Sequence, residues 1–140
     1  MQFMLIMRAT DEALAAAAEV PFTEMIERVG RFNEAMIEAG VMAGGGGLAP
    51  AEEGRVVDFS TTPPTIIEGG YGTTESRFNG YWIIDVPTID DAAEWAARAP
   101  LDPGNQLEVR RIPGADEFPE DNEWVQKEKE WIEQGQADAH

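Results

Sequence analysis

The chain has 140 residues, no cysteine, one histidine and a formal net charge of −17. This length suits one domain, and the missing cysteines exclude disulfides, a thiol nucleophile and cysteine-ligated zinc. The acidic excess argues against nucleic-acid binding, which needs clustered lysine and arginine, and without a long apolar run we expect no signal peptide, no membrane contact and a cytoplasmic location.

A buried strand and a long amphipathic helix are the first predicted elements. Residues 2–7 are apolar on both faces, which is typical of a strand covered on both sides. Residues 9–20 are rich in alanine and are closed by Pro21, so we expect a loop with room for one short helix. Residues 22–40 have clear helical periodicity. The predicted apolar stripe of this helix comprises Phe22, Met25, Ile26, Val29, Phe32, Met36 and Ile37.

The middle of the chain is predicted as short strands joined by glycine-rich loops. A strand begins at residues 41–43 and runs into four consecutive glycines, residues 44–47. A glycine run cradles phosphate when it opens a helix after a strand. Because Pro50 follows instead, we expect a bulge or a bent turn. Residues 55–60 and 65–68 are predicted strands, and residues 68–72 form a second flexible loop.

The C-terminal half contains a strand, a helix and a strand with little slack between them. Residues 80–87 and 106–113 are aromatic and β-branched, as strands are. Between them, a helix begins at the Thr-x-x-Asp pattern of residues 88–91 and ends at Pro100. Strands before and after each long helix predict an α+β fold, with helices on one face of an antiparallel sheet. Since residues 81–86 are apolar on both faces, we expect a homodimer that stacks two sheets.

An acidic extension, residues 114–140, carries one more predicted helix. One face of this helix comprises Trp124, Val125, Glu128, Trp131 and Ile132. Two tryptophans one heptad apart are costly to leave in water, so this helix must dock on the body of the chain or on a partner subunit. We expect residues 136–140 to fray.

Six segments recur in an order that is familiar from one protein family. They are Phe3-Met-Leu-Ile-Met7, Glu38-Ala-Gly-Val41, Gly46-Gly-Leu-Ala-Pro50, Gly80-Tyr-Trp-Ile-Ile-Asp-Val-Pro87, Glu94-Trp-Ala-Ala-Arg-Ala-Pro100 and Leu107-Glu-Val-Arg110. Through them, residues 1–113 resemble the DGPF subfamily of the YCII-related superfamily. The resemblance implies a ferredoxin-like, dimeric α+β barrel with two helices on one face of each sheet; residues 114–140 lie outside it.

The chain departs from this family at two functional positions. The signature Asp-Gly-Pro-Phe is represented by Glu68-Gly-Gly-Tyr71. The His/Asp pair that is credited with activity in the founding branch falls near Val29 and Ala99, which transfer no protons, and the only histidine is the terminal His140. By resemblance, such proteins are often encoded near extracytoplasmic-function sigma factors, which implies a regulatory role.

Candidate ligand-binding residues are polar or aromatic side chains on the predicted elements and the loop beside them. They are Arg8, Asn33, Tyr71, Glu75, Trp82, Asp85, Glu108 and Arg110. We expect Asn33 to bond a loop carbonyl in the core or to contact a ligand. Arg8 is placed to neutralise Asp85. Glu108 and Arg110 share a face of the last strand, where we expect a cross-strand or cross-dimer ion pair. The alternative is a pocket between sheet and helix in which Arg8 and Arg110 hold an anionic ligand.

Aromatic residues and one loop supply the remaining candidates. Trp82, Trp95, Tyr71 and Tyr81 either form core or line such a pocket. Glu75 and Arg77 are candidates for its rim, because they lie beside the glycine-rich loop.

Two functions remain open from the sequence. The first is a dimeric, non-catalytic accessory protein that binds a small anionic or aromatic ligand. The second is an enzyme of isomerase or lyase type, in which a carboxylate base such as Asp85 or Glu108 would need a pKa raised by burial. No cofactor and no metal site is predicted; a site built from carboxylates alone would favour Mg²⁺ or Ca²⁺.

Overall fold

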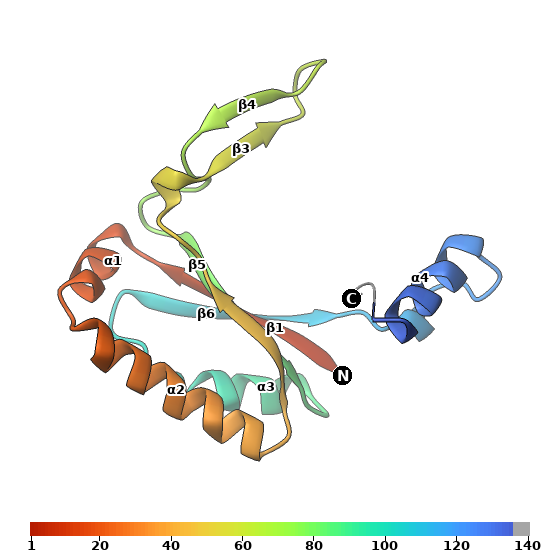
Figure 1. The fold of residues 1–140 in the computed structure, drawn as a ribbon, viewed down its shortest axis with the longest axis horizontal. Helices are drawn as coiled ribbons and strands as arrows, with labels where there is room; N and C mark the ends of the chain where they lie inside the picture. The colour runs from red at the N-terminus through yellow and green to blue at the C-terminus, as the bar shows by residue number, and fades with distance from the viewer. Residues whose placement is uncertain (136–140) are drawn as a thin grey trace.

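A four-stranded antiparallel sheet with the strand order β2-β5-β1-β6 forms the body of the molecule in the computed structural model, which describes residues 1–135. Its strands are β1 (Gln2–Ala9), β2 (Met42–Gly47), β5 (Arg77–Asp85) and β6 (Asn105–Ile112). The helices that accompany it are α1 (Asp11–Ala18), α2 (Phe22–Glu38) and α3 (Ile89–Ala96). Helices α2 and α3 lie on the same side of the sheet (Figure 1). The predicted α+β class is confirmed, and the strand order is consistent with a ferredoxin-like fold.

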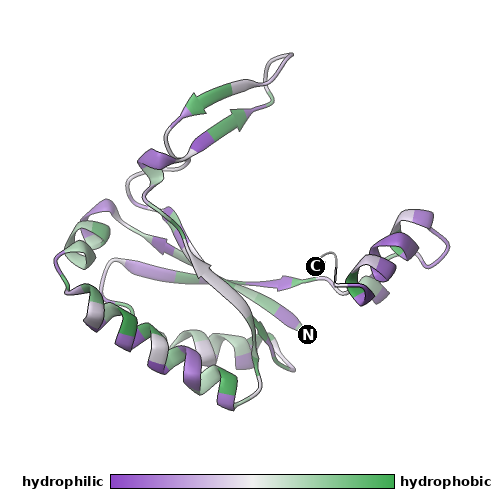
Figure 2. Cartoon of the chain, viewed as in Figure 1, coloured by the Kyte–Doolittle hydropathy of each residue, from purple (hydrophilic) through white to green (hydrophobic). Residues whose placement is uncertain are grey.

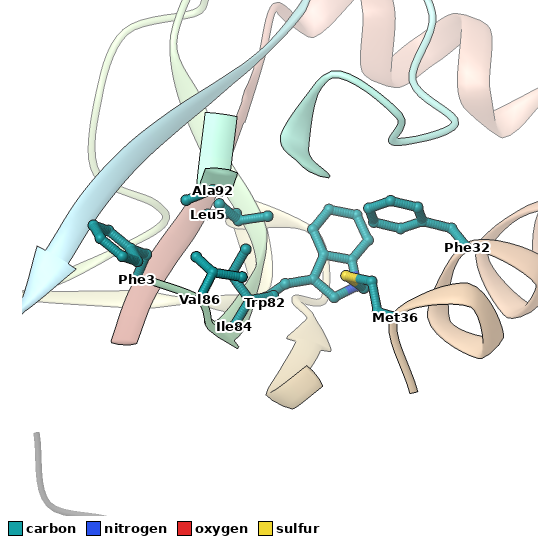
Figure 3. Packing of buried hydrophobic residues seen from close by; sticks show 8 residues of the cluster. All are labelled: Phe3, Leu5, Phe32, Met36, Trp82, Ile84, Val86 and Ala92. Carbon is teal, nitrogen blue, oxygen red and sulfur yellow. The ribbon is translucent and has the colours of Figure 1, made fainter. Parts of the chain in front are cut away.

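The core lies between the sheet and helices α2 and α3. Alternation along β1 directs Phe3 and Leu5 toward the helices, where both are fully buried. The ring of Phe32 on α2 meets the indole of Trp82 edge-on, with centroids 5.2 Å apart and ring planes at 84° (Figure 3). Ile84 completes this cluster with no exposed surface. The side of the sheet that faces these helices is therefore closed within one chain.

The buried face of α2 is narrower than its predicted stripe. Phe32 is buried, but Phe22, Ile26 and Ile37 are exposed. The prediction was wrong for these three residues, because a single sheet covers only the row of side chains directly opposite it. The periodicity identified the helix correctly and overestimated the width of its contact.

Helix α1 occupies the alanine-rich segment for which the sequence indicated mainly a loop. The hydroxyl of Thr10 caps the helix by accepting a hydrogen bond from the Ala13 amide at 3.0 Å. At the same end, the carbonyl of Gly104 accepts from the Thr10 amide at 3.1 Å. No side chain of α1 is buried. The helix is thus held mainly at its N-terminus.

The glycine run lies in edge strand β2. The predicted irregularity is present, as the pairing with β5 shifts register between Met42 and Gly44. A Cβ atom on Gly45 would lie 3.0 Å from the carbonyl oxygen of Tyr81 and 3.1 Å from Cδ1 of Trp82. Glycine at this position therefore lets the strand backbone approach the indole closely.

Two segments project away from the body (Figure 1). One is a hairpin of β3 (Arg55–Asp58) and β4 (Thr65–Glu68), whose strands pair only with each other within the described chain. The other is α4 (Glu123–Glu133), which follows β6 through a short 3₁₀ turn, Ala115–Glu117. A second 3₁₀ turn, Ala51–Glu53, precedes the hairpin. We refer to the hairpin β3–β4 and the helix α4 as the two arms.

Apolar side chains of both arms are exposed. They are Val57, Phe59, Ile66 and Ile67 in the hairpin and Trp124 and Trp131 in α4. Figure 2 shows apolar stretches in both strands of the hairpin. Within residues 1–135, α4 does not cover the sheet, so the alternative of docking on the body is wrong for this chain alone. The predicted fraying of residues 136–140, which include His140, lies outside the described residues.

The accessible surface of the chain is large for its mass. It measures 9739 Å², whereas a compact monomer of 15.4 kDa is expected to expose about 7,200 Å². We attribute the additional accessible area to the two arms and to the helix-free face of the sheet. No helix among the described residues combines the length and apolar character needed to cross a bilayer.

Candidate small-molecule cavity

A cavity of about 290 Å³ lies between α1, α2 and the side of the sheet that these helices face. Most of its wall is apolar. Side chains that contribute to it include Met7, Leu14, Met25, Val29, Trp82 and Leu101. Ligand sites typically range from about 300 to 1,000 Å³, so this cavity suits a small molecule at the lower end of that range.

Asn33 and Trp82 meet at the wall of the cavity. The indole Nε1 donates a hydrogen bond to Asn33 Oδ1 at 2.9 Å. The predicted alternative of a loop carbonyl as the partner of Asn33 is therefore wrong, because α2 places this residue opposite β5. With its oxygen engaged, Asn33 retains the two N–H donors of its amide. Two predicted site residues are thus brought together beside the cavity.

Asn79 is a polar residue of the cavity that the sequence predictions missed. It lies in β5 and lines the cavity, and its Oδ1 is buried with no hydrogen-bond donor among the described residues. An unpaired buried acceptor costs about 1–3 kcal/mol, so such a group calls for a partner. The signal available in the sequence was an asparagine inside a strand, where this residue type is depleted.

The charge around the cavity is acidic. Among the described residues that line it, Asp102 alone is charged, and Arg28 Nη1 donates to its Oδ2 at 3.4 Å. No arginine or lysine side chain lines the cavity. The cavity therefore offers nothing to neutralise an anionic ligand.

Arg8, Glu108 and Arg110 form an ion cluster on the helix-free face. Arg8 Nε donates to Glu108 Oε1 at 3.3 Å, and Arg110 Nη1 lies 3.5 Å from Glu108 Oε2. The predicted cross-strand ion pair is present and joins Glu108 to Arg8 of β1, while Arg110 contacts Glu108 within β6. The predicted pocket between sheet and helix does not contain Arg8 and Arg110, so this prediction was wrong. Alternation along β1 and β6 directs both arginines to the opposite face of the sheet.

The predicted pair of Arg8 and Asp85 is also wrong. Strand register places Asp85 opposite Gln2, whereas Arg8 lies opposite Phe78 at the other end of β1. The partner of Asp85 is the amino nitrogen of Met1, at 3.1 Å from Oδ1. The Asp85 side chain is 60% exposed. Asp85 is therefore exposed to solvent and does not line the cavity.

The remaining candidates lie elsewhere. Tyr71 is 84% exposed and borders an open depression of about 820 Å³ at the base of the hairpin, together with Arg8. Glu75 is exposed, and Arg77 donates to Asp11 Oδ1 at 3.1 Å. Of the other predicted aromatic residues, Tyr81 lines the cavity, whereas Trp95 lies under the guanidinium of Arg98, 4.2 Å from the ring centroid.

Within residues 1–135, no three His, Cys, Asp or Glu side chains converge as a metal site requires. Comparison of the chain with known proteins gives no match to a family model and no significant match to a curated sequence.

Proposed function

We propose that the chain is a homodimeric, non-catalytic binding protein of the YCII-related, DGPF type, and that it holds a small neutral ligand in the cavity between α1, α2 and the sheet. One observation carries the proposal: Asn79, whose buried Oδ1 has no hydrogen-bond donor among the described residues, is one of the few polar residues that line a mainly apolar cavity. Such a wall binds an apolar molecule by burial, and a few polar groups orient it.

The polar groups of the wall select the chemistry of the ligand. Asn79 Oδ1 needs a donor, and Asn33 retains donors of its own beside the Trp82 indole. A hydroxyl or a primary amide serves both, since each group donates and accepts. No arginine or lysine lines the cavity to balance the charge of an anion. A neutral phenol or aromatic amide is therefore the class of ligand that we propose, in preference to an anionic one.

The enzyme alternative lacks a residue in the right place. Asp85 is largely exposed, and Glu108 is held between Arg8 and Arg110 on the other face of the sheet. Neither lines the cavity, and a carboxylate base near neutral pH needs burial to raise its pKa. A regulatory role beside an extracytoplasmic-function sigma factor stays a prediction from the family resemblance.

The dimer is supported by the uncovered face of the sheet. Met4 and Ile83 pair on this face and are only partly buried, and no helix of the described chain covers it. The surface beyond that of a compact monomer is about 2,500 Å², whereas a standard interface takes about 800 Å² from each partner. Two stacked sheets would form the barrel that the resemblance implies.

Ligand binding is tested by the thermal stability of the purified protein in the presence of phenol, benzamide, toluene and benzoate. We expect saturable stabilisation by phenol and benzamide, worth about 2.7 kcal/mol at one hundred times the dissociation constant. Toluene should bind more weakly because it leaves Asn79 unpaired, and benzoate should not bind. Equal stabilisation by benzoate, or none by any of the four compounds, would overturn the proposed ligand class.

A matched pair of variants locates the site. Met25 lines the cavity, whereas its neighbour Ile26 is exposed. Met25→Trp should fill the cavity and abolish stabilisation by phenol, and Ile26→Trp should leave it unchanged. Asn79→Leu should remove the preference for phenol over toluene. Stabilisation by phenol that survives Met25→Trp would place the ligand elsewhere.

A further inference from the structure

The hairpin arm is a two-stranded sheet without a third strand or a covering helix among the described residues. An isolated two-stranded sheet is marginal at best, and here both faces carry apolar pairs. Val57 lies opposite Ile66 on one face, and Val56 lies opposite Ile67 on the other. The Ile66 side chain is 70% exposed. The hairpin therefore requires a covering surface that the described chain does not supply.

Helix α4 has the same requirement. It is 11 residues long, and isolated helices shorter than about 12–15 residues are marginal in water. Trp124 is 64% and Trp131 is 40% exposed. Packing of an apolar face, rather than intrinsic propensity, stabilises most helices in proteins. Apart from Lys127, whose Nζ lies 4.3 Å from the centroid of the Trp124 ring, nothing among the described residues is seen to cover the two exposed tryptophans.

A defined turn determines where α4 leaves the sheet. Glu117 Oε2 accepts hydrogen bonds from Arg111 Nη1 at 2.6 Å and from the Gly114 amide at 2.7 Å. The side chain of Asn122 then caps α4 by accepting from the amides of Trp124 and Val125. These contacts build a specific turn between β6 and the helix, so α4 projects in a set direction rather than trailing as a loose tail.

The two arms lie at opposite ends of the sheet, on either side of its helix-free face (Figure 1). A two-fold axis over this face, running along the view of Figure 1, exchanges the two ends. Because the arms lie at opposite ends, α4 of each copy would then lie at the end that carries the hairpin of the other copy, and an interface of this kind closes on itself. A foreign partner that covered one arm would leave the arm at the other end in water.

We propose that α4 of one copy packs its tryptophan face on the hairpin β3–β4 of a second copy, and reciprocally, so that two exchanged arms close the homodimer. The inference rests on the proposed homodimer and names the surfaces that hold it together. The size of the excess surface agrees, because the two arms add contact area that stacked sheets alone do not use.

The absence of cysteine makes the proposal directly testable by cross-linking. A double variant, Val57→Cys with Val125→Cys, places one thiol on the hairpin and one on α4. With a short bis-maleimide we expect a covalent dimer on a denaturing gel and a mapped link between positions 57 and 125. Replacing Val57→Cys by Val56→Cys reports the other face of the hairpin. Either link supports the arm exchange.

The control pairs Val125→Cys with Asp90→Cys, since Asp90 is exposed at the start of α3 on the helix-covered side. This pair should give no more covalent dimer than each single variant. Sedimentation of the unmodified protein separates the proposed homodimer from the proposed arm exchange. A monomer at micromolar concentration would overturn both, whereas a dimer without a link at position 56 or 57 would overturn the arm exchange alone.

Tryptophan substitution gives an independent readout. Trp124→Ala with Trp131→Ala should raise the dimer dissociation constant about 30-fold or more, as expected for central aromatic contacts. Glu130→Ala, on the polar side of α4, should leave the constant unchanged, because the Glu130 side chain is exposed. An unaltered dissociation constant in the double tryptophan variant would overturn the proposed contact even if the dimer itself persists.

Discussion

The body and the two arms are made of similar residues but differ in what surrounds them. In the body, Phe3, Leu5, Met36 and Ile84 are fully buried within one copy of the chain. In the arms, isoleucine, phenylalanine and tryptophan side chains lie in solvent. Apolar surface that is enclosed stabilises folding of the single chain, whereas apolar surface that is exposed becomes stabilising only on association. The two regions should therefore respond differently to the same substitution.

The largest expected effect tests the body directly. Leu5→Ala removes a side chain with no exposed surface and should lower the free energy of unfolding by about 2–5 kcal/mol. Ile66→Ala in the hairpin should change it by about 0.5 kcal/mol or less when the chain is monomeric. Urea denaturation at low protein concentration measures both. Equal losses would show that the hairpin belongs to the same enclosed core.

The hydrogen bond beside the cavity provides the second test. Asn33→Ala leaves the Trp82 indole N–H without its partner and should cost about 1–3 kcal/mol. Glu34 is exposed on the same helix, so Glu34→Ala is the matched control and should be close to neutral. Denaturation monitored by tryptophan fluorescence follows both variants. An unchanged stability in Asn33→Ala would mean that water replaces the amide at no cost.

The edge strand offers a comparison between adjacent glycines. A Cβ on Gly45 would crowd Tyr81 and Trp82, whereas a Cβ on Gly44 meets nothing within 4 Å. Gly45→Ala should destabilise the body by about 1–3 kcal/mol through overpacking and should shift the Trp82 fluorescence. Gly44→Ala should be neutral or stabilising by about 0.4–1 kcal/mol, because it restricts the unfolded chain. Identical behaviour would contradict the close approach of β2 to the indole.

The smallest expected effect concerns the base of the α4 arm and depends on pH. Two hydrogen bonds lower the pKa of Glu117 from its ordinary value of 4.5: the larger effect comes from Arg111 and the smaller from the Gly114 amide. The charged carboxylate is favoured in the folded turn, so its stabilisation is present above pH 4.5 and is lost as the pH falls through the lowered pKa. The Gly114 amide resonance should titrate in this range. In Glu117→Gln it should not.

Elements with strong periodicity could be predicted from the sequence, and long-range pairings could not. The helix over residues 22–38 and the strand around Trp82 follow from local pattern alone. The partner of Arg8 depends on strand register, which places Phe78 rather than Asp85 opposite it. Asn79 enters the candidate site only because the fold buries its side-chain oxygen beside the cavity. The burial of this oxygen could not be predicted from the amino-acid sequence, because it depends on how the fold packs around Asn79.

The weak anchoring of α1 has a consequence for access to the cavity. This helix contributes Ala13 and Leu14 to the cavity wall, yet none of its side chains is buried. A segment held chiefly by contacts at one end detaches at a free energy well below that of global unfolding. Its amides should exchange with deuterium sooner than those of β1 and β5. Detachment of α1 would give the ligand that we propose a way into and out of the cavity while the sheet and α2 stay intact.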